Sequence, residues 1–168
     1  MHAAAGYYDG TLRNDGDDLW RGDLSLIILF DQFSRNIYRG TPQAFMNDEI
    51  AYGIVDKVFS KGDEEKESKL KGLPVVCRHF MMMPFMHREE IAAQKRGLEI
   101  LKGLLEECRE AEVEGMVEYF EGCLEFGEKH CEVIRKFGRF PHRNKALSRE
   151  SSREEREYLE QGGATWGQ

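Results

Sequence analysis

Apolar residues in this chain recur every three or four positions, which is the spacing that lines one face of an α-helix. In the segment 112–137 this stripe contains Val113, Met116, Val117, Phe120 and Leu124. No segment shows the alternation of apolar and polar residues that is typical of a half-buried strand. Because every apolar stripe has to be buried against another, we predict an all-α fold of antiparallel helix pairs joined by short connections.

Glycine, proline and capping residues divide these stripes into separate helices. Asp23 follows Gly22 and is expected to cap the first helix, and Pro84 is expected to end the third. The sequence Ser152-Arg153-Glu154-Glu155 has the pattern of a capping box, which opens a short last helix. The expected helices cover residues 23–38, 48–59, 68–83, 87–109, 112–137 and 152–161.

One domain is expected for a chain of 168 residues, which is long enough to bury a core. The segment 1–22 is rich in Gly and Asp and is expected to be irregular, and it is short enough to suggest truncation. The single helical domain is then 23–162, and residues 163–168 form a flexible tail.

The charge of the chain restricts its partners. It contains 24 Lys and Arg against 31 Asp and Glu, a net charge of −7, which disfavours binding to the phosphate backbone of nucleic acids. No apolar run approaches the roughly 20 residues of a membrane span, and the first residues lack the pattern of a secretory signal. The four cysteines include no Cys-x-x-Cys pair, which indicates free thiols in a reducing compartment. We therefore expect a cytoplasmic protein with neither a nucleic-acid nor a membrane partner.

Charged residues on the first expected helix are placed where they do not face bulk water. At about 100° per residue, Asp31 and Arg35 share a face with apolar residues such as Ile27. The opposite face is apolar too, so the helix is expected to be buried on both sides; that face consists of Leu26, Leu29, Phe30, Phe33 and Ile37. Buried charges must be paired or must face a wet cavity. One interpretation is an ion pair that fixes the helix register, and the other is a pocket floor that presents Arg35 or Arg39 to an anionic ligand.

Two further groups of polar residues are candidates for the same pocket. Arg139, His142, Arg143 and Asn144 lie in the loop after the fifth helix, and His87 stands where the fourth helix is expected to begin, with acidic residues in its first turn. Each group also has a purely structural interpretation. The loop side chains would then form hydrogen bonds to helix ends and neighbouring carboxylates, and His87 would cap its helix or pack against other side chains.

Other chemistries lack their residue patterns. No two of His79, His87, His130 and His142 are three or four positions apart, and no cysteine stands at ligand spacing from them. There is no Gly-x-Ser-x-Gly motif and no glycine-rich phosphate loop. We therefore predict no metal site and no cofactor.

Three motifs of the chain are similar to those of one known family. The first is Leu29-Phe30-Asp31-Gln32-Phe33-Ser34-Arg35-Asn36-Ile37-Tyr38-Arg39-Gly40, where family members usually have Leu-Leu-Asp-Gln-Phe-Pro-Arg-Asn-Ile-Tyr-Arg-Gly. The second is Pro84-Phe85-Met86-His87 with Glu89, and the third is Phe137-Gly138-Arg139-Phe140-Pro141-His142-Arg143-Asn144 with Arg149-Glu150-Ser151. From about Gly10 to Gly162 the chain resembles the domain-of-unknown-function family number nine hundred and twenty-four.

The resemblance implies an all-helical, tetratricopeptide-like (TPR-like) array, and it implies no settled activity. The repeat pattern of that fold is not present in the sequence. Ser34 stands where the family usually has proline, which favours a more regular first helix. Family members also carry further helical sequence before the segment of Trp20. A helical layer is therefore expected to be missing, which leaves an N-terminal apolar face exposed and favours oligomers.

The residues support three functional hypotheses. The first, which we favour, is a TPR-like binding module for a protein or peptide partner. The second is a small-molecule enzyme or sensor whose pocket holds a small anionic molecule, with a His as general acid or base. The third is that the motifs are structural clasps. If the three motifs line one shared cavity, the small-molecule hypothesis is favoured. If each motif pairs only with its own neighbours, the hypothesis of structural clasps is favoured. The candidate ligand-binding residues are Asp31, Gln32, Arg35, Asn36, Arg39, His87, Arg139, His142, Arg143 and Asn144.

Overall fold

The computed structural model describes residues 19–60, 62 and 64–166, and every regular element in them is helical, as predicted. The elements in chain order are α2 (Leu19–Ile27), the π-helical segment η1 (Ile28–Phe33), α3 (Ser34–Ile37), the 3₁₀ turn η2 (Pro42–Phe45), α4 (Asp48–Val58), α5 (Glu64–Lys71), α6 (Val75–His87), α7 (Ile91–Glu110), α8 (Met116–Phe137), the 3₁₀ turn η3 (Pro141–Arg143) and α9 (Arg153–Glu160). Most of the segment 1–22 lies outside the described residues, but 19–22 belong to α2 and are not irregular. Within the described part, no helix combines the length and the hydropathy that crossing a bilayer requires.

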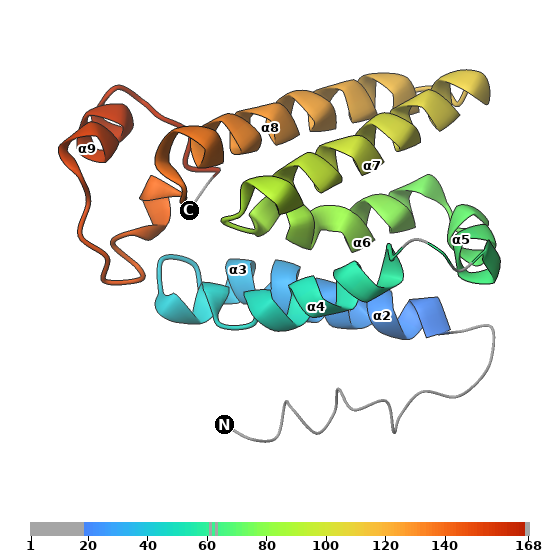
Figure 1. Cartoon of the computed structure of the whole chain (residues 1–168), viewed down its shortest axis with the longest axis horizontal. Coiled ribbons are helices and arrows are strands. Elements are labelled where there is room, and N and C mark those ends of the chain that lie inside the picture. The colour runs from blue at the N-terminus through green and yellow to red at the C-terminus, as the bar shows by residue number, and fades with distance from the viewer. Residues whose placement is uncertain (1–18, 61, 63, 167–168) are drawn as a thin grey trace.

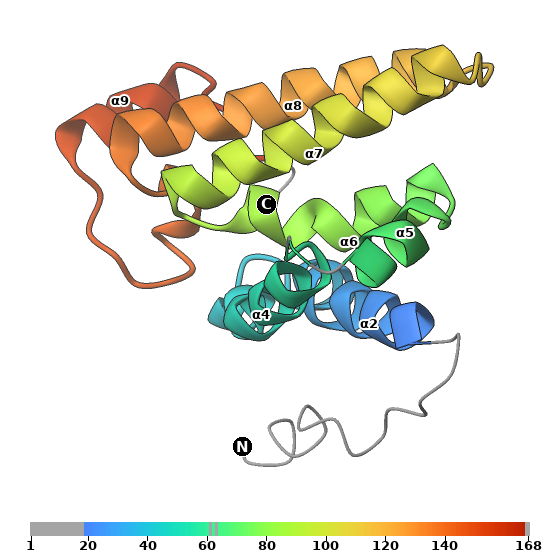
Figure 2. The same ribbon diagram turned by 45° about the vertical axis from the view of Figure 1, so that its right-hand side comes forward.

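The helices stack in layers (Figures 1 and 2). α7 and α8 form an antiparallel pair, α6 packs against α7, and α2, α3 and α4 lie on the other side of α6. The loop after α8 runs from the outer pair toward the layer of α3 and α4 (Figure 1). Segments far apart in the sequence therefore meet at one end of the molecule. The predicted antiparallel helix pairs are present, and the TPR-like classification stays a prediction.

The core lies between these layers. α6, α7 and α8 approach closely at two glycines: a Cβ atom on Gly97 would lie 2.4 Å from the Met86 sulfur, and one on Gly127 would lie 2.9 Å from Leu98. The four cysteines are free thiols. The largest fully buried apolar side chains are Phe85, Phe120, Phe140, Ile27, Ile54, Met81, Met82, Leu101 and Val55.

The first helix contains a wide turn, because η1 is π-helical. In a regular α-helix, residues at a strict four-residue spacing drift around the axis, since one turn takes about 3.6 residues. A π-helical turn takes more residues and offsets this drift. As a result, Ile27, Asp31 and Arg35 all lie buried on one face. The helix is thus not a regular α-helix, and the prediction that Ser34 makes it more regular than proline would stays a prediction.

The opposite face of the first helix is exposed, so the prediction of burial on both sides is also wrong. Leu29, Phe33 and Ile37 retain 50%, 52% and 67% exposure, while Leu26 and Phe30 are partly buried against the core. The reason is that this helix belongs to an outer layer, where α4 and α6 cover one side of it. Association of the protein through the exposed apolar residues stays a prediction.

Several helix boundaries differ from those predicted. Asp23 is a buried residue inside α2 and not its N-cap. Pro74 separates α5 from α6, where one helix was predicted over 68–83. Glu89 and Glu90 precede α7, so they do not form its first turn. Helix ends are the least well determined part of a sequence-based prediction, because capping residues can also stand inside a helix or before it.

Pro84 lies within α6 and does not end it, contrary to prediction. Proline removes one backbone hydrogen bond of a helix interior and disfavours its continuation. Here Phe85 and Met86, which follow it, are buried in the core, so their packing outweighs that loss. The consequence for the site is direct, because the added turn carries His87 to the end of the helix.

Candidate functional site

A cavity of about 160 Å³ lies where the first helix, the ends of α6 and α8, and the loop after α8 meet. Three arginines and three histidines line it, and none of the described lining residues is acidic. The lining is basic in a chain whose net charge is −7, and Asp31 and Asp48 pair with two of its arginines from behind. The lining residues are Gln32, Arg35, Asn36, Arg39, His87, His130, Phe140, His142, Arg143 and Trp166.

Asp31 anchors two of the lining side chains from behind. Its Oδ1 lies 2.6 Å from His87 Nδ1 and accepts a hydrogen bond of 3.2 Å from Arg35 Nε. Burial raises the pKa of this carboxyl, but His87, Arg35 and Gln32 together outweigh the effect and hold the pKa at about 2. Asp31 is 1% exposed and therefore stays ionised only because these partners surround it.

Asp48, in the first turn of α4, joins Arg35 to Arg143. Its Oδ1 accepts a 2.8 Å hydrogen bond from Arg35 Nη2, and its Oδ2 lies 3.4 Å from Arg143 Nη1. The guanidinium of Arg143 also lies 4.8 Å from the ring centre of Phe45 and 4.4 Å from that of Phe140. These aromatic faces and the shared carboxylate hold both guanidinium groups in place at the cavity.

Three residues that line this cavity each have a buried polar atom without a partner among the described residues. Arg35 Nη1, Arg143 Nε and His142 Nδ1 are buried and form no hydrogen bond to the described residues. Arg35 and Arg143 are only 7% and 5% exposed. Leaving a buried donor on a charged group unpaired costs about 1–3 kcal/mol or more, so these atoms are expected to have a partner in the functional protein.

The histidines of the cavity are neutral at physiological pH. Burial lowers the pKa of His130 and that of His142 to about 3 each, and the positive charge of Arg143 contributes to both shifts. Burial likewise lowers the pKa of His87. Burial and the charge of Arg35 lower the pKa of Arg143 to about 10, so its guanidinium remains protonated. The positive charge of the wall therefore comes from the arginines.

Aromatic rings close one side of the cavity. The Trp166 indole stacks on the His130 ring with centroids 4.0 Å apart, and it contacts Phe140 and His142 edge-on. Trp166 belongs to the predicted flexible tail over 163–168; its side chain packs against α8 and the loop, and the flexibility of the tail stays a prediction. Trp166 is therefore part of the cavity lining.

The loop after α8 is held by a separate network. Glu155 accepts hydrogen bonds from Arg139 Nε at 2.6 Å and from Asn144 Nδ2 at 3.2 Å. It also completes the predicted capping box with Ser152 at the start of α9. Glu89 accepts from the Phe140 backbone N–H at 2.8 Å, which ties the loop to the connection before α7. These contacts orient the loop without entering the cavity.

The structure brings most of the predicted site residues together. Asp31 stands directly behind the lining, bonded to two of its side chains. Arg139 and Asn144 do not line the cavity and belong to the network of Glu155. The predicted residues that line the cavity are Gln32, Arg35, Asn36, Arg39, His87, His142 and Arg143.

Sequence reasoning missed Asp48, His130 and Trp166. Asp48 is the first residue of α4, and its side chain turns to the two arginines. For His130 a signal exists, because it lies two helical turns before the loop that carries His142. No local pattern connects Trp166 to the site.

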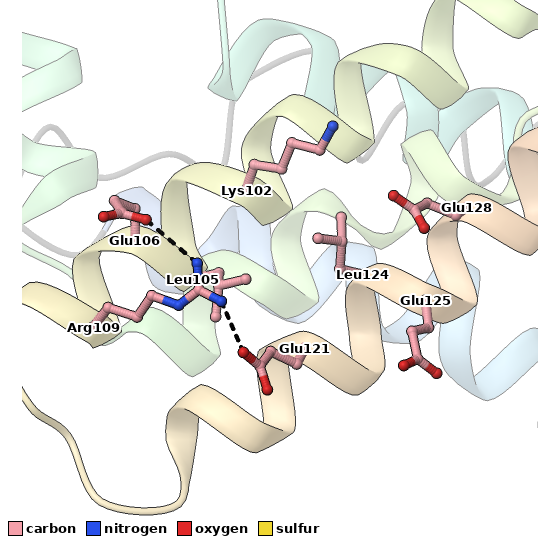
Figure 3. Close-up of a pocket in the computed structure, with 8 residues that line it drawn as sticks. All are labelled: Lys102, Leu105, Glu106, Arg109, Glu121, Leu124, Glu125 and Glu128. Carbon is pink, nitrogen blue, oxygen red and sulfur yellow. Dashed lines mark hydrogen bonds and ion pairs between the residues drawn. The ribbon is translucent and has the colours of Figure 1, made fainter.

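Two other hollows occur on the described surface and have a different character. One, between α7 and α8, contains Glu121, Glu125 and Glu128 together with Arg109 (Figure 3). Arg109 pairs there with Glu121 at 2.7 Å and also with Glu106. The other, of about 800 Å³, lies beside α4, α5 and α7 and has both acidic and basic residues. Neither hollow has buried polar atoms without partners in the described part of the chain. Within that part, no group of His, Cys, Asp and Glu is arranged to hold a metal ion.

These features define an all-α protein with a small cavity lined by cations. The chain belongs to the family described as "Bacterial protein of unknown function (DUF924)", which matches residues 2–163. A solved structure titled as a protein of unknown function from Agrobacterium tumefaciens is similar to it, with 34% sequence identity and a TM-score of 0.69. The match covers 96% of this chain and 77% of that one. No protein with a curated description matches the sequence significantly.

Proposed function

We propose that this protein binds a small anionic molecule in the cavity between the first helix, α6 and the loop after α8. The observation that carries the proposal is the pair of unpartnered donors, Arg35 Nη1 and Arg143 Nε, on guanidinium groups that are almost fully buried in one wall. An anion accepting from both would satisfy them with charge-assisted hydrogen bonds.

The volume of the cavity limits the size of this ligand. About 160 Å³ corresponds to roughly five water molecules, since each occupies about 30 Å³ in the liquid. A phosphate ion or a carboxylate of a few carbons fits this space, whereas drug-sized ligands occupy pockets of about 300 Å³ or more.

The peptide-binding module that the sequence favours has less support than this pocket. A helix or strand of a partner does not fit into 160 Å³. In addition, the three sequence motifs do not each pair only with their own neighbours: His87 of the second motif bonds Asp31 of the first, and Arg143 of the third shares Asp48 with Arg35. By the criterion of a shared cavity, the small-molecule hypothesis gains.

The experiment is a binding measurement with phosphate, sulfate, acetate and glycolate by isothermal titration calorimetry at constant ionic strength. At least one of these anions is expected to bind. Arg143→Met keeps an unbranched side chain as far as the position of Nε but removes the guanidinium and all of its donors. A lost charge-assisted hydrogen bond of about 1.5–3 kcal/mol weakens binding by at least about tenfold.

The matched control is Arg96→Met. Arg96 bonds Asp56 at 2.6 Å and lies 4.9 Å from the Phe85 ring centre, so it resembles Arg143 in charge and contacts but does not line the cavity. The Arg96→Met variant should bind anions as the unmodified protein does.

If Arg143→Met does not fold, Asn36→Asp at the exposed rim adds a negative charge to the same wall and should also weaken binding. Equal weakening by all variants, or no binding of any anion, would refute the proposal.

A further inference from the structure

His87 and His130 can both offer the cavity a ring nitrogen as hydrogen-bond acceptor, since Nδ1 of His130 lies 2.7 Å from the Phe126 carbonyl oxygen. Of the two, it is His87 that is joined through Asp31 to Arg35. The Nδ1 of His87 lies 2.6 Å from Asp31 Oδ1, and a short contact between a ring nitrogen and a carboxylate requires a proton on that nitrogen. Arg35 Nε lies at similar distances from both atoms, 3.3 Å from His87 Nδ1 and 3.2 Å from Asp31 Oδ1. Because Nδ1 already carries a proton, the Arg35 donor is directed to the carboxylate.

The charges around His87 keep the imidazole neutral. Burial lowers its pKa; Asp31 opposes this effect, and Arg35 and Arg143 reinforce it. Asp48 also faces the ring but is shared between the two arginines. A neutral imidazole with its proton on Nδ1 has a lone pair on Nε2. No residue in the described part of the chain donates a hydrogen bond to that nitrogen.

We infer that the ligand is a small anion that also carries a hydrogen-bond donor, such as an O–H group, which His87 Nε2 accepts while the arginines bind the negative charge. This inference rests on the proposed anion-binding function. The ligand class is therefore a short hydroxy carboxylate or a phosphate that keeps one proton. A fully deprotonated anion would place an oxygen against the lone pair, which is repulsive.

The test compares anions that differ in one donor. Hydrogen phosphate is compared with sulfate, and glycolate with acetate, by calorimetry on the full-length protein at mildly alkaline pH and constant ionic strength. The member with the O–H group should bind at least about tenfold more tightly in each pair. Equal affinities within the pairs, or tighter binding of sulfate and acetate, overturn this inference but leave the anion site in place. If none of the four binds, both proposals fail.

Two histidine variants locate the discrimination. His87→Phe keeps a ring but removes the acceptor, so the two members of each pair should then bind with similar affinity. His79→Phe is the control, because His79 is also on α6 but bonds Tyr119 at 3.0 Å and does not line the cavity. It should keep the preference. Discrimination that survives His87→Phe overturns the inference.

The tautomer of the His87 imidazole can be determined by nuclear magnetic resonance without any ligand or variant. Long-range proton–nitrogen correlation spectra of the unmodified protein distinguish a protonated from an unprotonated ring nitrogen. The expected pattern for His87 is a proton on Nδ1 and none on Nε2. A proton on Nε2, with or without one on Nδ1, removes the acceptor and overturns the inference even if His87→Phe does not fold.

Discussion

The carboxylate of Glu155 accepts hydrogen bonds from Arg139 Nε and Nη2, from Asn144 Nδ2 and from the Ser152 backbone N–H, at 2.6, 2.8, 3.2 and 2.7 Å. It is 2% exposed, and the bonds to Arg139, followed by those to Ser152 and Asn144, hold its pKa at about 2 against the effect of burial. Glu155 is therefore a central acceptor for the chain between Phe137 and α9, which carries His142 and Arg143, beside the contacts that Glu89 makes to the same loop.

Replacement of Glu155 by alanine is expected to destabilise the protein by about 3 kcal/mol. The reason is that Arg139 and Asn144 then lose their shared acceptor, and removal of one partner from a buried charged network costs this much. Urea unfolding monitored by circular dichroism measures the change. Glu154→Ala, at an exposed neighbouring position in the same helical turn, should stay within about 0.5 kcal/mol of the unmodified protein. Similar stabilities of the two variants would contradict the role given to Glu155.

At the residue scale, the sequence allowed prediction of the cationic part of the site but not of its surroundings. Asp31 and Arg35 were identified because helical spacing places charges on a face that must be buried, and the structure confirms their burial. Arg139 was grouped with Arg143 because the two lie in one loop. Their different roles depend on which carboxylate each meets, Glu155 or Asp48, and both contacts join distant segments.

At the scale of elements, close contact between helices depends on two glycines. Gly97 of α7 faces α6, where an added Cβ would lie 2.4 Å from the Met86 sulfur and 3.2 Å from Phe85 Cβ. Met86 is flexible enough to move, but Phe85 Cβ is fixed by the backbone of α6. Gly103, two turns further along the same helix, has no atom within 4 Å of an added Cβ. Alanine substitutions at the two positions therefore distinguish the effect of close packing from the effect of helix propensity.

Gly97→Ala should destabilise the protein by about 1–2 kcal/mol, because overpacking of about 1–3 kcal/mol outweighs a gain in helix propensity of at most about 1 kcal/mol. Gly103→Ala gains the propensity without the clash and should stabilise the protein by about 0.5–1 kcal/mol. Opposite signs in thermal unfolding are the expected result. If Gly97→Ala also stabilises, α6 and α7 are further apart than the structure shows.

The helices themselves were predictable because their apolar periodicity is long and regular, as in α8. Three details were not. The π-helical turn η1 depends on how Asp31 and Arg35 are held by α4 and α6, and the continuation of α6 past Pro84 depends on burial of Phe85. Likewise, the first helix was expected to be covered on both faces, because its sequence does not show that it belongs to an outer layer.

At the scale of the whole molecule, the fold places basic groups at one internal point of an acidic chain. Helix packing brings the ends of α6 and α8 and the loop after α8 to the first helix (Figure 1), and the histidines of these segments become neutral there. A neutral buried histidine costs stability when the solution is acidic, because the unfolded chain takes up protons that the folded chain does not. Stability is therefore linked to pH through the site.

The neutral histidines contribute their full share of the stability above the pKa of histidine in the unfolded chain, about 6.5. This contribution is lost progressively as the pH falls below that value. His130 and His142, with folded pKa values of about 3, are the main contributors, and burial also lowers the pKa of His79 and His87. Each fully protected imidazole gives a slope of at most about 1.4 kcal/mol per pH unit. Urea unfolding between about pH 6.5 and 5 reports mainly on the histidines, because the acidic side chains of the unfolded chain titrate near pH 4. Asp48, whose pKa is raised by burial, opposes their slope where it takes up a proton in the folded protein.

His142→Asn tests whether this slope originates at the cavity. The variant removes one titrating group and keeps a polar atom near the position of Nδ1. It also loses the ring contacts with Phe140 and Trp166, so its stability at neutral pH should be somewhat lower, and the test compares the slopes with pH. The slope of its unfolding free energy against pH should be smaller than that of the unmodified protein. The difference should be close to the slope that one titrating proton gives. An unchanged slope would mean that His142 is protonated in the folded protein, and the cavity wall would then carry a positive charge that the present structure assigns only to its arginines.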